Sequence, residues 1–231
     1  VFPMTFLLSG TEYQHHLDHR MMDNHKFYDG LRVGAVATTV AVNPSEWIAM
    51  SRPYLQAGQD VLILSFSSGL STTANNARIA AGELTEEFPD RKVLVVDSLS
   101  ASMGEGLFCF HVARKRQSGA SLEETQASAE ESKLQVCHWF TVDDLHFLKR
   151  GGRVSSTAAV VGTMLQIKPV LHVDDEGHLI PVSKVRGRRA SLNALVNEMM
   201  KTAIDPEHQT VFISHGDSLE DAEYVKRLVQ E

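Results

Sequence analysis

Residues 61–77 read VLILSFSSGLSTTANNA. The first five residues, Val61–Ser65, are almost wholly apolar and favour β-structure, which predicts a buried parallel strand. The chain then turns through the serines and glycine of residues 67–71, and we expect a helix to begin near Thr72. Hydroxyl and backbone N–H groups therefore gather where a strand ends and a helix begins. Open α/β sheets bind ligands at that place, and the helix dipole favours an anion there.

Strands and helices alternate around this stretch. We expect strands at 1–8, 61–66 and 92–96, and helices at 18–32, from 44, at 72–82, 101–117 and 121–134. Asp18 and Asn43 are the expected N-caps of the first two helices, and Ser121 with Glu124 forms a capping box. This alternation predicts an α/β fold whose first domain, residues 1–136, contains a doubly wound, mostly parallel sheet.

The pattern changes after residue 136. We expect strands at 137–142 and 210–214, a hairpin of strands 168–173 and 179–184, and helices at 143–150, from 155 or 156 to 165, at 188–203 and 217–230. A hairpin between helices predicts a second, α+β domain at residues 137–231. Because the sequence opens in a strand and stops in a helix, we expect a fragment that lacks N- and C-terminal segments.

Composition excludes several classes of protein. The net charge of −7 opposes binding to nucleic acid, and no run of 18 apolar residues predicts a membrane span. Two cysteines, Cys109 and Cys137, are too few for a disulfide framework or a zinc site, and no secretion signal is visible, so we expect a cytoplasmic protein. His15 and His19 have helical spacing, but no His-Glu-x-x-His pattern occurs, and we predict no metal site.

Five motifs occur in one order along the chain. They are SSGLSTT at 67–73, VVDSLSASMGEG at 95–106, DDLHFLKRGGRVS at 143–155, LQIKPVL at 165–171 and KVRGRRA at 184–190. Together they resemble the DegV family, whose best-understood members are the fatty-acid-binding subunits of bacterial fatty acid kinase. The resemblance spans nearly the whole chain.

The resemblance implies a carrier without catalytic residues or a cofactor. Its ligand would be a long-chain fatty acid, with the carboxylate against hydroxyls of the first domain and the acyl chain in a pocket to which the second domain contributes. A separate kinase subunit would phosphorylate the bound carboxylate with ATP, which gives an acyl phosphate for phospholipid synthesis.

The family motifs also imply site residues. The carboxylate ligands fall on Thr39 and Ser68, with Ser67 as the adjacent candidate. The usual Thr-Ser-Gln of the family is Thr39-Val40-Ala41 here, so the resemblance does not extend to its neighbouring polar contacts. Further candidates for the ligand site or its cleft are Ser71, Asp97, Ser98, Arg153 and His215.

Basic residues are concentrated between residues 149 and 189. This segment contains eight basic residues and three acidic ones, Asp174, Asp175 and Glu176. Its net charge is therefore +5, in a protein of net charge −7. The family resemblance favours docking of the kinase partner through Lys184, Arg186, Arg188 and Arg189. A solvated surface is the alternative interpretation.

Other functions remain open at this stage. The ligand could be another anionic lipid or a small carboxylate. A serine hydrolase could use Ser68, Asp97 and His215 in the chain order of α/β-hydrolases, although the Gly-x-Ser-x-Gly elbow is missing. Ser67, Ser68 and Ser71 could also serve only to cap the following helix.

Overall fold

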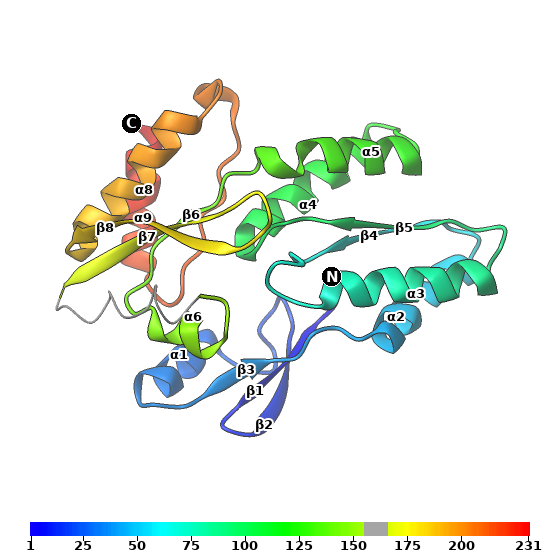
Figure 1. Cartoon of the computed structure of the whole chain (residues 1–231), viewed down its shortest axis with the longest axis horizontal. Coiled ribbons are helices and arrows are strands. Elements are labelled where there is room, and N and C mark those ends of the chain that lie inside the picture. Colours follow the sequence, from blue (N-terminus) through cyan, green and yellow to red (C-terminus); the bar gives the residue numbers. More distant parts are fainter. Residues whose placement is uncertain (155–165) are drawn as a thin grey trace. The chain divides into compact units, whose positions relative to one another are not determined.

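The computed structural model describes residues 1–154 and 166–231 (Figure 1). The chain forms two compact units, Val1–Asp97 and Ser98–Glu231. The helix expected from residue 155 or 156 to 165 lies outside the described residues, and a domain boundary at 136/137 remains a prediction. The mixed α/β class is confirmed, with three sheets among the described residues.

The first unit opens with an antiparallel sheet of strand order β2-β1-β3. Its strands are β1 (Met4–Leu8), β2 (Thr11–His15) and β3 (Ala37–Thr39). Phe6 of β1 lies opposite Tyr13 on one side and Thr39 on the other. Only two residues separate β1 from β2, and such a short turn joins antiparallel strands because a parallel pair needs a long crossover.

Helix α1 (Asn24–Arg32) begins later than the sequence pattern indicated. Asp18 was expected to cap this helix, but its carboxylate accepts a hydrogen bond from Arg20 Nε at 3.0 Å. Asp23 is the N-cap instead, since its side chain accepts from the Lys26 N–H at 3.1 Å. Strand β2, at Thr11–His15, was not among the expected strands.

A parallel pair follows, formed by β4 (Val61–Ser65) and β5 (Val93–Asp97), as the opening stretch predicted. Helices α2 (Pro44–Gln56) and α3 (Thr73–Glu87) pack against each other beside it (Figure 1). The capping box of Asn43 and Glu46 starts α2. The buried core of this unit consists of Val42, Trp47, Leu55, Ile63, Ala77, Ala80, Ala81, Leu84 and Val93.

The prediction of one mostly parallel sheet in the first domain was therefore only partly correct. The described strands of the first unit form two sheets, and parallel pairing is limited to β4 and β5. The apolar runs of β4 and β5 suit strands covered on both faces, whereas β1 and β2 remain partly exposed.

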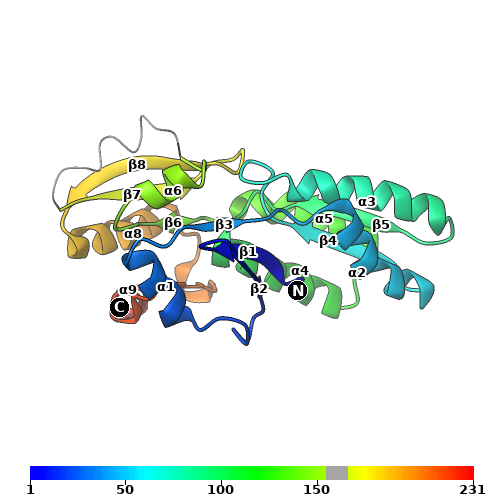
Figure 2. The same ribbon diagram turned by 90° about the horizontal axis from the view of Figure 1, so that it is seen from below.

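The second unit begins with α4 (Ser102–Gln117) and α5 (Leu122–Ser132), and the predicted capping box of Ser121 and Glu124 is confirmed. An antiparallel sheet of order β6-β7-β8 follows. The remaining elements are the 3-10 turns Lys133–Gln135 and Pro206–His208, β6 (Trp139–Phe140), α6 (His146–Arg150), β7 (Ile167–Val173), β8 (Leu179–Arg186), α8 (Arg188–Thr202) and α9 (Leu219–Gln230). Figure 2 shows α8 along one face of this sheet, where it packs against its strands.

The hairpin of β7 and β8 confirms the prediction made from the acidic turn at residues 174–177. Asp174 fixes this turn, because one carboxylate oxygen accepts from the backbone N–H groups of Glu176 and His178 at 3.0 and 2.8 Å. The strand expected at 210–214 was wrong: within the described parts of the chain, no strand is assigned there. An apolar β-prone run becomes a strand only when a backbone partner is available. Here the ring of Phe212 lies 5.6 Å from that of Phe110 on α4, tilted by 50°.

Candidate functional site

The candidate site lies in the first unit, where β4 and β5 end. Ser65 is paired with Asp97 in the last register position of the parallel strands. The chain leaves β4 at Ser65 and enters α3 at Thr73, so residues 66–72 form the connecting turn. We call this segment the serine turn.

Ser67 organises the serine turn from inside. The residue is fully buried at 0% exposure. Its hydroxyl oxygen accepts the Gly69 N–H at 3.1 Å, and its carbonyl oxygen accepts the N–H groups of Leu70 and Ser71, both at 3.1 Å. Three amides of the turn are thus satisfied by one residue, which gives Ser67 a structural role in the turn.

Ser71 caps the following helix. Its hydroxyl oxygen accepts the Thr73 N–H at 3.2 Å, and the hydroxyls of Ser71 and Thr73 lie 2.8 Å apart. The side chain of Thr72, which occupies the N-cap position itself, makes no capping hydrogen bond. The capping interpretation of the serines therefore holds for Ser71.

Ser68 differs from both neighbours because it is exposed. Its backbone N–H donates to Asp97 Oδ1 at 3.1 Å. Its hydroxyl has no hydrogen-bond partner among residues 1–154 and 166–231. Of the three predicted turn serines, Ser68 presents the hydroxyl that is best placed to meet a ligand.

Thr39 ends β3 and is also exposed. Three residues later, the carbonyl of Val42 accepts a hydrogen bond from the side-chain amide of Asn76 at 2.8 Å. Asn76 lies on the first turn of α3, the helix that the serine turn begins. The structure therefore ties the segment after Thr39 to the same helix end as Ser68.

Asp97 is almost fully buried, with 7% exposure. Besides the Ser68 amide, its carboxylate faces the guanidinium of Arg78 on α3, with Oδ2 and Nη2 3.5 Å apart. A buried carboxylate needs such partners because desolvation penalises its charge.

Ser98, also predicted as a cleft residue, is fully buried in the second unit. Its hydroxyl accepts the Ser100 N–H at 3.2 Å, and its carbonyl accepts the Ser100 hydroxyl at 3.0 Å. Leu99 between them has φ 49°, a left-handed conformation that a bulky residue rarely adopts. These bonds hold a strained turn, and strained turns are often found at functional sites.

Arg153 and His215 make local contacts. The guanidinium of Arg153 donates to the carbonyl of Gly151 in its own turn. His215 Nδ1 accepts the Ser218 N–H at 3.1 Å, just before α9. A triad histidine would donate from Nδ1 to the aspartate, and here Nδ1 accepts instead. The described contacts of Asp97 and His215 thus do not support a Ser68–Asp97–His215 hydrolase.

The four basic residues predicted for docking divide into two pairs. Lys184 and Arg186 are exposed on β8. Arg188 Nε lies 2.7 Å from Asp221 Oδ2 and joins α8 to α9. Arg189 places its guanidinium 3.5 Å from the centroid of the Tyr224 ring, a cation–π contact. Arg188 and Arg189 therefore contact α9, while Lys184, Arg186 and Arg189 are the exposed members of the set.

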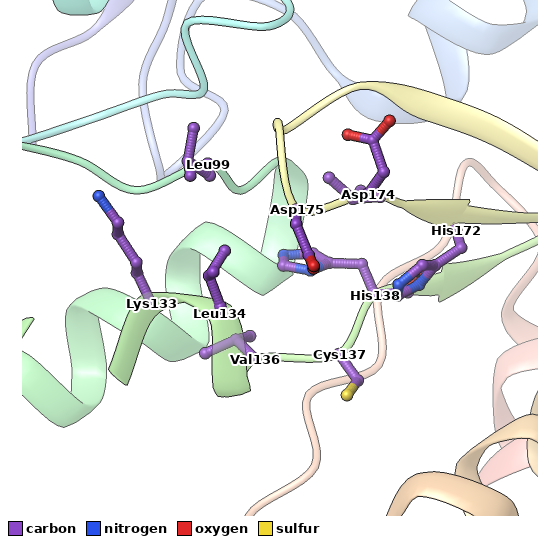
Figure 3. A pocket seen from close by; sticks show the side chains of 10 residues that line it. Leu99, Lys133, Leu134, Val136, Cys137, His138, His172, Asp174 and Asp175 are labelled. Carbon is purple, nitrogen blue, oxygen red and sulfur yellow. The ribbon is translucent and has the colours of Figure 1, made fainter. Parts of the chain in front are cut away.

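A small pocket in the second unit was not foreseen from the sequence (Figure 3). Its volume is about 30 Å³, which suits a water molecule. Burial, together with the nearby His172, lowers the pKa of His138 to about 4. The ring of His172 stacks on Trp139 at 4.4 Å, and its Nδ1 donates to the carbonyl of His138 at 2.7 Å. The pocket is lined by Leu99, Lys133, Leu134, Val136, Cys137, His138, His172, Val173, Asp174 and Asp175.

No group of three histidine, cysteine or acidic side chains suited to a metal ion occurs within the described ranges. The rings of His15 and His19 stack 5.6 Å apart. In the same part of the chain, no helix has both the length and the apolar character needed to cross a bilayer.

The fold and motifs together define a known class. The DegV family, described as a family of uncharacterised proteins, matches residues 1–231, and the chain belongs to this family. A DegV domain-containing protein of Clostridium perfringens is 41% identical over 224 residues, which cover 97% of this chain and 77% of the relative.

Solved structures share the fold. A DegV family protein from Ruminococcus gnavus, solved with vaccenic acid, aligns with a TM-score of 0.85 and 21% identity over 99% of this chain and 80% of its own. A DegV family protein from Thermus thermophilus, described as fatty acid binding, aligns with a TM-score of 0.75 and 30% identity. The alignment covers 89% of this chain and 70% of that protein. The Streptococcus pneumoniae Fatty Acid Kinase (Fak) B3 protein, loaded with linoleic acid, aligns with a TM-score of 0.75 and 22% identity. The alignment covers 86% of this chain and 69% of that protein.

Proposed function

We propose that this chain binds a long-chain fatty acid and presents its carboxyl group to a separate ATP-dependent kinase subunit. The chain acts as a carrier and contributes no catalytic residue and no cofactor. The observation that carries the proposal is membership of the DegV family, together with the 30% identity to a Thermus thermophilus member described as fatty acid binding.

The hydroxyls of Thr39 and Ser68 are the proposed carboxylate ligands. Both residues are exposed in the first unit; Ser68 lies in the turn before α3, and the segment after Thr39 is bonded to α3 through Val42 and Asn76. Neutral hydroxyl donors satisfy a carboxylate without neutralising it, so one oxygen remains nucleophilic toward a phosphate donor. Ser67 and Ser71 contribute indirectly, by shaping the serine turn.

The acyl chain supplies most of the binding free energy. Burial of about 16 carbons at roughly 0.8 kcal/mol per CH₂ gives on the order of 10 kcal/mol before the costs of binding. A pocket for that chain, with a contribution from residues 137–231, is part of the proposal. The hydroxyl ligands prevent the loss of this energy to an unpartnered carboxylate.

The kinase partner would dock on Lys184 and Arg186. These side chains are exposed on β8, and a basic pair steers encounter with an acidic surface. Arg188 is engaged with Asp221 and supports this surface, while the exposed Arg189 stays part of the proposed docking surface beside its contact with Tyr224.

Lipid extraction and mass spectrometry of the purified protein test the proposed function. We expect a fatty acid in stoichiometric amount, retained through gel filtration. Recovery of a phospholipid, or of no lipid, would contradict the proposal of a fatty-acid carrier. A protein without lipid that hydrolyses p-nitrophenyl esters would support a hydrolase instead.

Point variants test the two hydroxyls. Thr39→Ala and Ser68→Ala should each weaken palmitate binding by about 10- to 100-fold, the typical value of one hydrogen bond to a charged group, without lowering stability. Thr38→Ala is the matched control, because Thr38 is exposed on the same strand and points to the opposite face. Equal binding by all three variants would remove Thr39 and Ser68 from the site.

A further inference from the structure

Several backbone amides of the serine turn, and that of Thr73 at the start of α3, already donate to internal partners. Five of them donate inside the first unit, those of Ser68, Gly69, Leu70, Ser71 and Thr73, at 3.1, 3.1, 3.1, 3.1 and 3.2 Å respectively. Their acceptors are groups of Ser67 and Ser71 and the carboxylate of Asp97. The turn resembles a phosphate-binding loop in its position after a strand, but its N–H groups point to internal partners.

This occupation limits what the turn can bind. A phosphate group is held by several converging backbone N–H groups at a helix N-terminus. With these five amides committed, fewer N–H groups are left for a ligand, and the exposed side-chain hydroxyl of Ser68 is a donor that the turn offers outward. One or two hydroxyl donors suit a single carboxylate and leave a phosphate dianion poorly satisfied.

Asp97 is the acceptor that comes from outside the turn. It is buried at the end of β5, and one oxygen holds the Ser68 amide while the other faces Arg78 on α3. The residue therefore joins a strand, a turn and a helix at the point where the ligand head group is expected. Its negatively charged carboxylate contacts the backbone of Ser68, the residue that carries the hydroxyl.

We propose that Asp97 is a positioning residue: it accepts the hydrogen bond of the Ser68 N–H and so fixes the Ser68 hydroxyl toward the ligand. This arrangement makes the site selective for carboxylate over phosphate head groups. The proposal rests on the proposed function and deepens it, because it names the head-group chemistry. Asp97 itself does not touch the ligand. Its charge also disfavours a second negative charge on the head group, which a phosphate would bring at neutral pH.

The protein offers a matched control for this arrangement. Asp60 lies immediately before β4, at the other end of the same strand pair. Its Oδ1 accepts the Lys92 N–H at 2.9 Å and lies 3.7 Å from Arg91 Nη1. Asp60 and Asp97 therefore make the same two kinds of contact, one far from the candidate site and one inside it.

Amide hydrogen exchange followed by NMR tests the positioning role without any ligand. Asp97→Ala should speed exchange of the Ser68 amide by about 10-fold or more, the equivalent of losing one charge-assisted hydrogen bond. Asp97→Asn keeps an acceptor oxygen and should restore protection. Wild-type exchange at Ser68 in Asp97→Ala, or global loss of protection in both variants, would overturn the positioning role.

Ligand binding tests the selectivity. The full chain is titrated with palmitic acid labelled with 13C at the carboxyl carbon and with hexadecyl phosphate. We expect palmitate to bind at least about 10-fold more tightly, and Asp97→Asn to lower the apparent pKa of the bound carboxyl group because a like charge is removed. Asp60→Asn should change neither quantity. Equal affinity for the two lipids, or identical carboxyl titrations in wild type and Asp97→Asn, would contradict the proposal.

These arms separate the two proposals. If wild-type protein binds neither lipid, the proposed function fails, and the exchange experiment still decides whether Asp97 holds the turn. If palmitate binds and the Asp97 variants behave as wild type, only the inference about Asp97 fails.

Discussion

The side-chain amide of Asn76 donates a hydrogen bond to the backbone carbonyl of Val42 at 2.8 Å. This bond connects α3 with the segment that follows Thr39, and Val42 and Ala77 next to it belong to one buried core. Of the two proposed hydroxyl ligands, Thr39 ends β3 of one sheet, and Ser68 lies in the turn after β4 of the other. The bond from Asn76 is a polar contact between the segment after Thr39 and the helix after Ser68.

Asn76→Ala tests this relationship. Loss of the bond leaves the Val42 carbonyl without its side-chain donor, and we expect a destabilisation of about 1 kcal/mol. Palmitate binding should weaken by a larger factor than stability alone explains, because Thr39 loses its fixed position relative to Ser68. Urea denaturation and fatty-acid titration measure the two effects.

The neighbouring Asn75→Ala is the control for that variant. Asn75 is exposed on the same helix turn, so its removal should leave both stability and binding within error of wild type. Unchanged binding in Asn76→Ala would mean that the position of Thr39 does not depend on this contact.

Local sequence signals predicted the elements that local interactions determine. The N-cap at Asn43, the capping box at Ser121 and the strands expected at 61–66 and 92–96 are confirmed, the strands within one residue at their ends. Each depends on residues within one turn of helix or on a continuous apolar run. The acidic hairpin turn at residues 174–177 belongs to the same group.

Tertiary partners decided where the sequence reading was wrong. Residues 210–214 have strand-like composition, but a strand needs a neighbouring backbone that the pattern does not reveal. Asp18 looked like a cap, but its carboxylate is bonded to Arg20 and the helix begins after Asp23. The commitment of Arg188 to Asp221, 33 residues away, was equally invisible.

The docking surface can be separated from its support by mutation. Lys184→Glu combined with Arg186→Glu should leave the free energy of unfolding within about 0.5 kcal/mol of wild type, because both side chains are exposed. The same pair of changes should slow association with the kinase subunit by about 10-fold or more at low salt. Stopped-flow association at two ionic strengths measures this.

Arg188→Ala is the comparison for that experiment. Its ion pair with Asp221 is two-thirds covered, with side-chain exposures of 31% and 32%, so its loss should destabilise the protein by about 1–2 kcal/mol. Kinase association at a temperature where the variant is folded should stay near the wild-type rate. If the exposed pair has no effect and Arg188→Ala abolishes association, the docking surface has been misassigned.

Gly104 on α4 packs directly against the ring of His138. A Cβ at residue 104 would overlap Nε2 and Cδ2 of that ring. Gly104→Ala should therefore cost about 1–3 kcal/mol, despite the higher helix propensity of alanine. Gly82→Ala on α3 is the control, since its Cβ would meet nothing within 4 Å, and it should stabilise by roughly 0.5–1 kcal/mol. A stabilised Gly104→Ala variant would show that His138 moves away freely.

Glu105 on the same helix makes stability depend on pH. Burial raises the pKa of this carboxyl to about 7 from its usual 4.5, so the folded state holds a proton that the unfolded chain releases. The sign follows from linkage: the contribution to stability is fully present below pH 4.5 and is lost as the pH rises through 7. At pH 8, where Glu105 is charged, the free energy of unfolding should be lower by roughly 2–3 kcal/mol.

Glu105→Gln removes this dependence. The variant should gain stability over wild type between pH 5 and pH 8 in urea titrations at several pH values, since glutamine carries no charge to bury. Glu124→Gln provides the opposite sign, because hydrogen bonds from Ser121 lower the pKa of Glu124 and favour its charged form in the folded state. That variant should lose stability at neutral pH and converge with wild type in acid. A difference between Glu105→Gln and wild type that stays flat across the range would show that Glu105 is hydrated and charged in the folded protein.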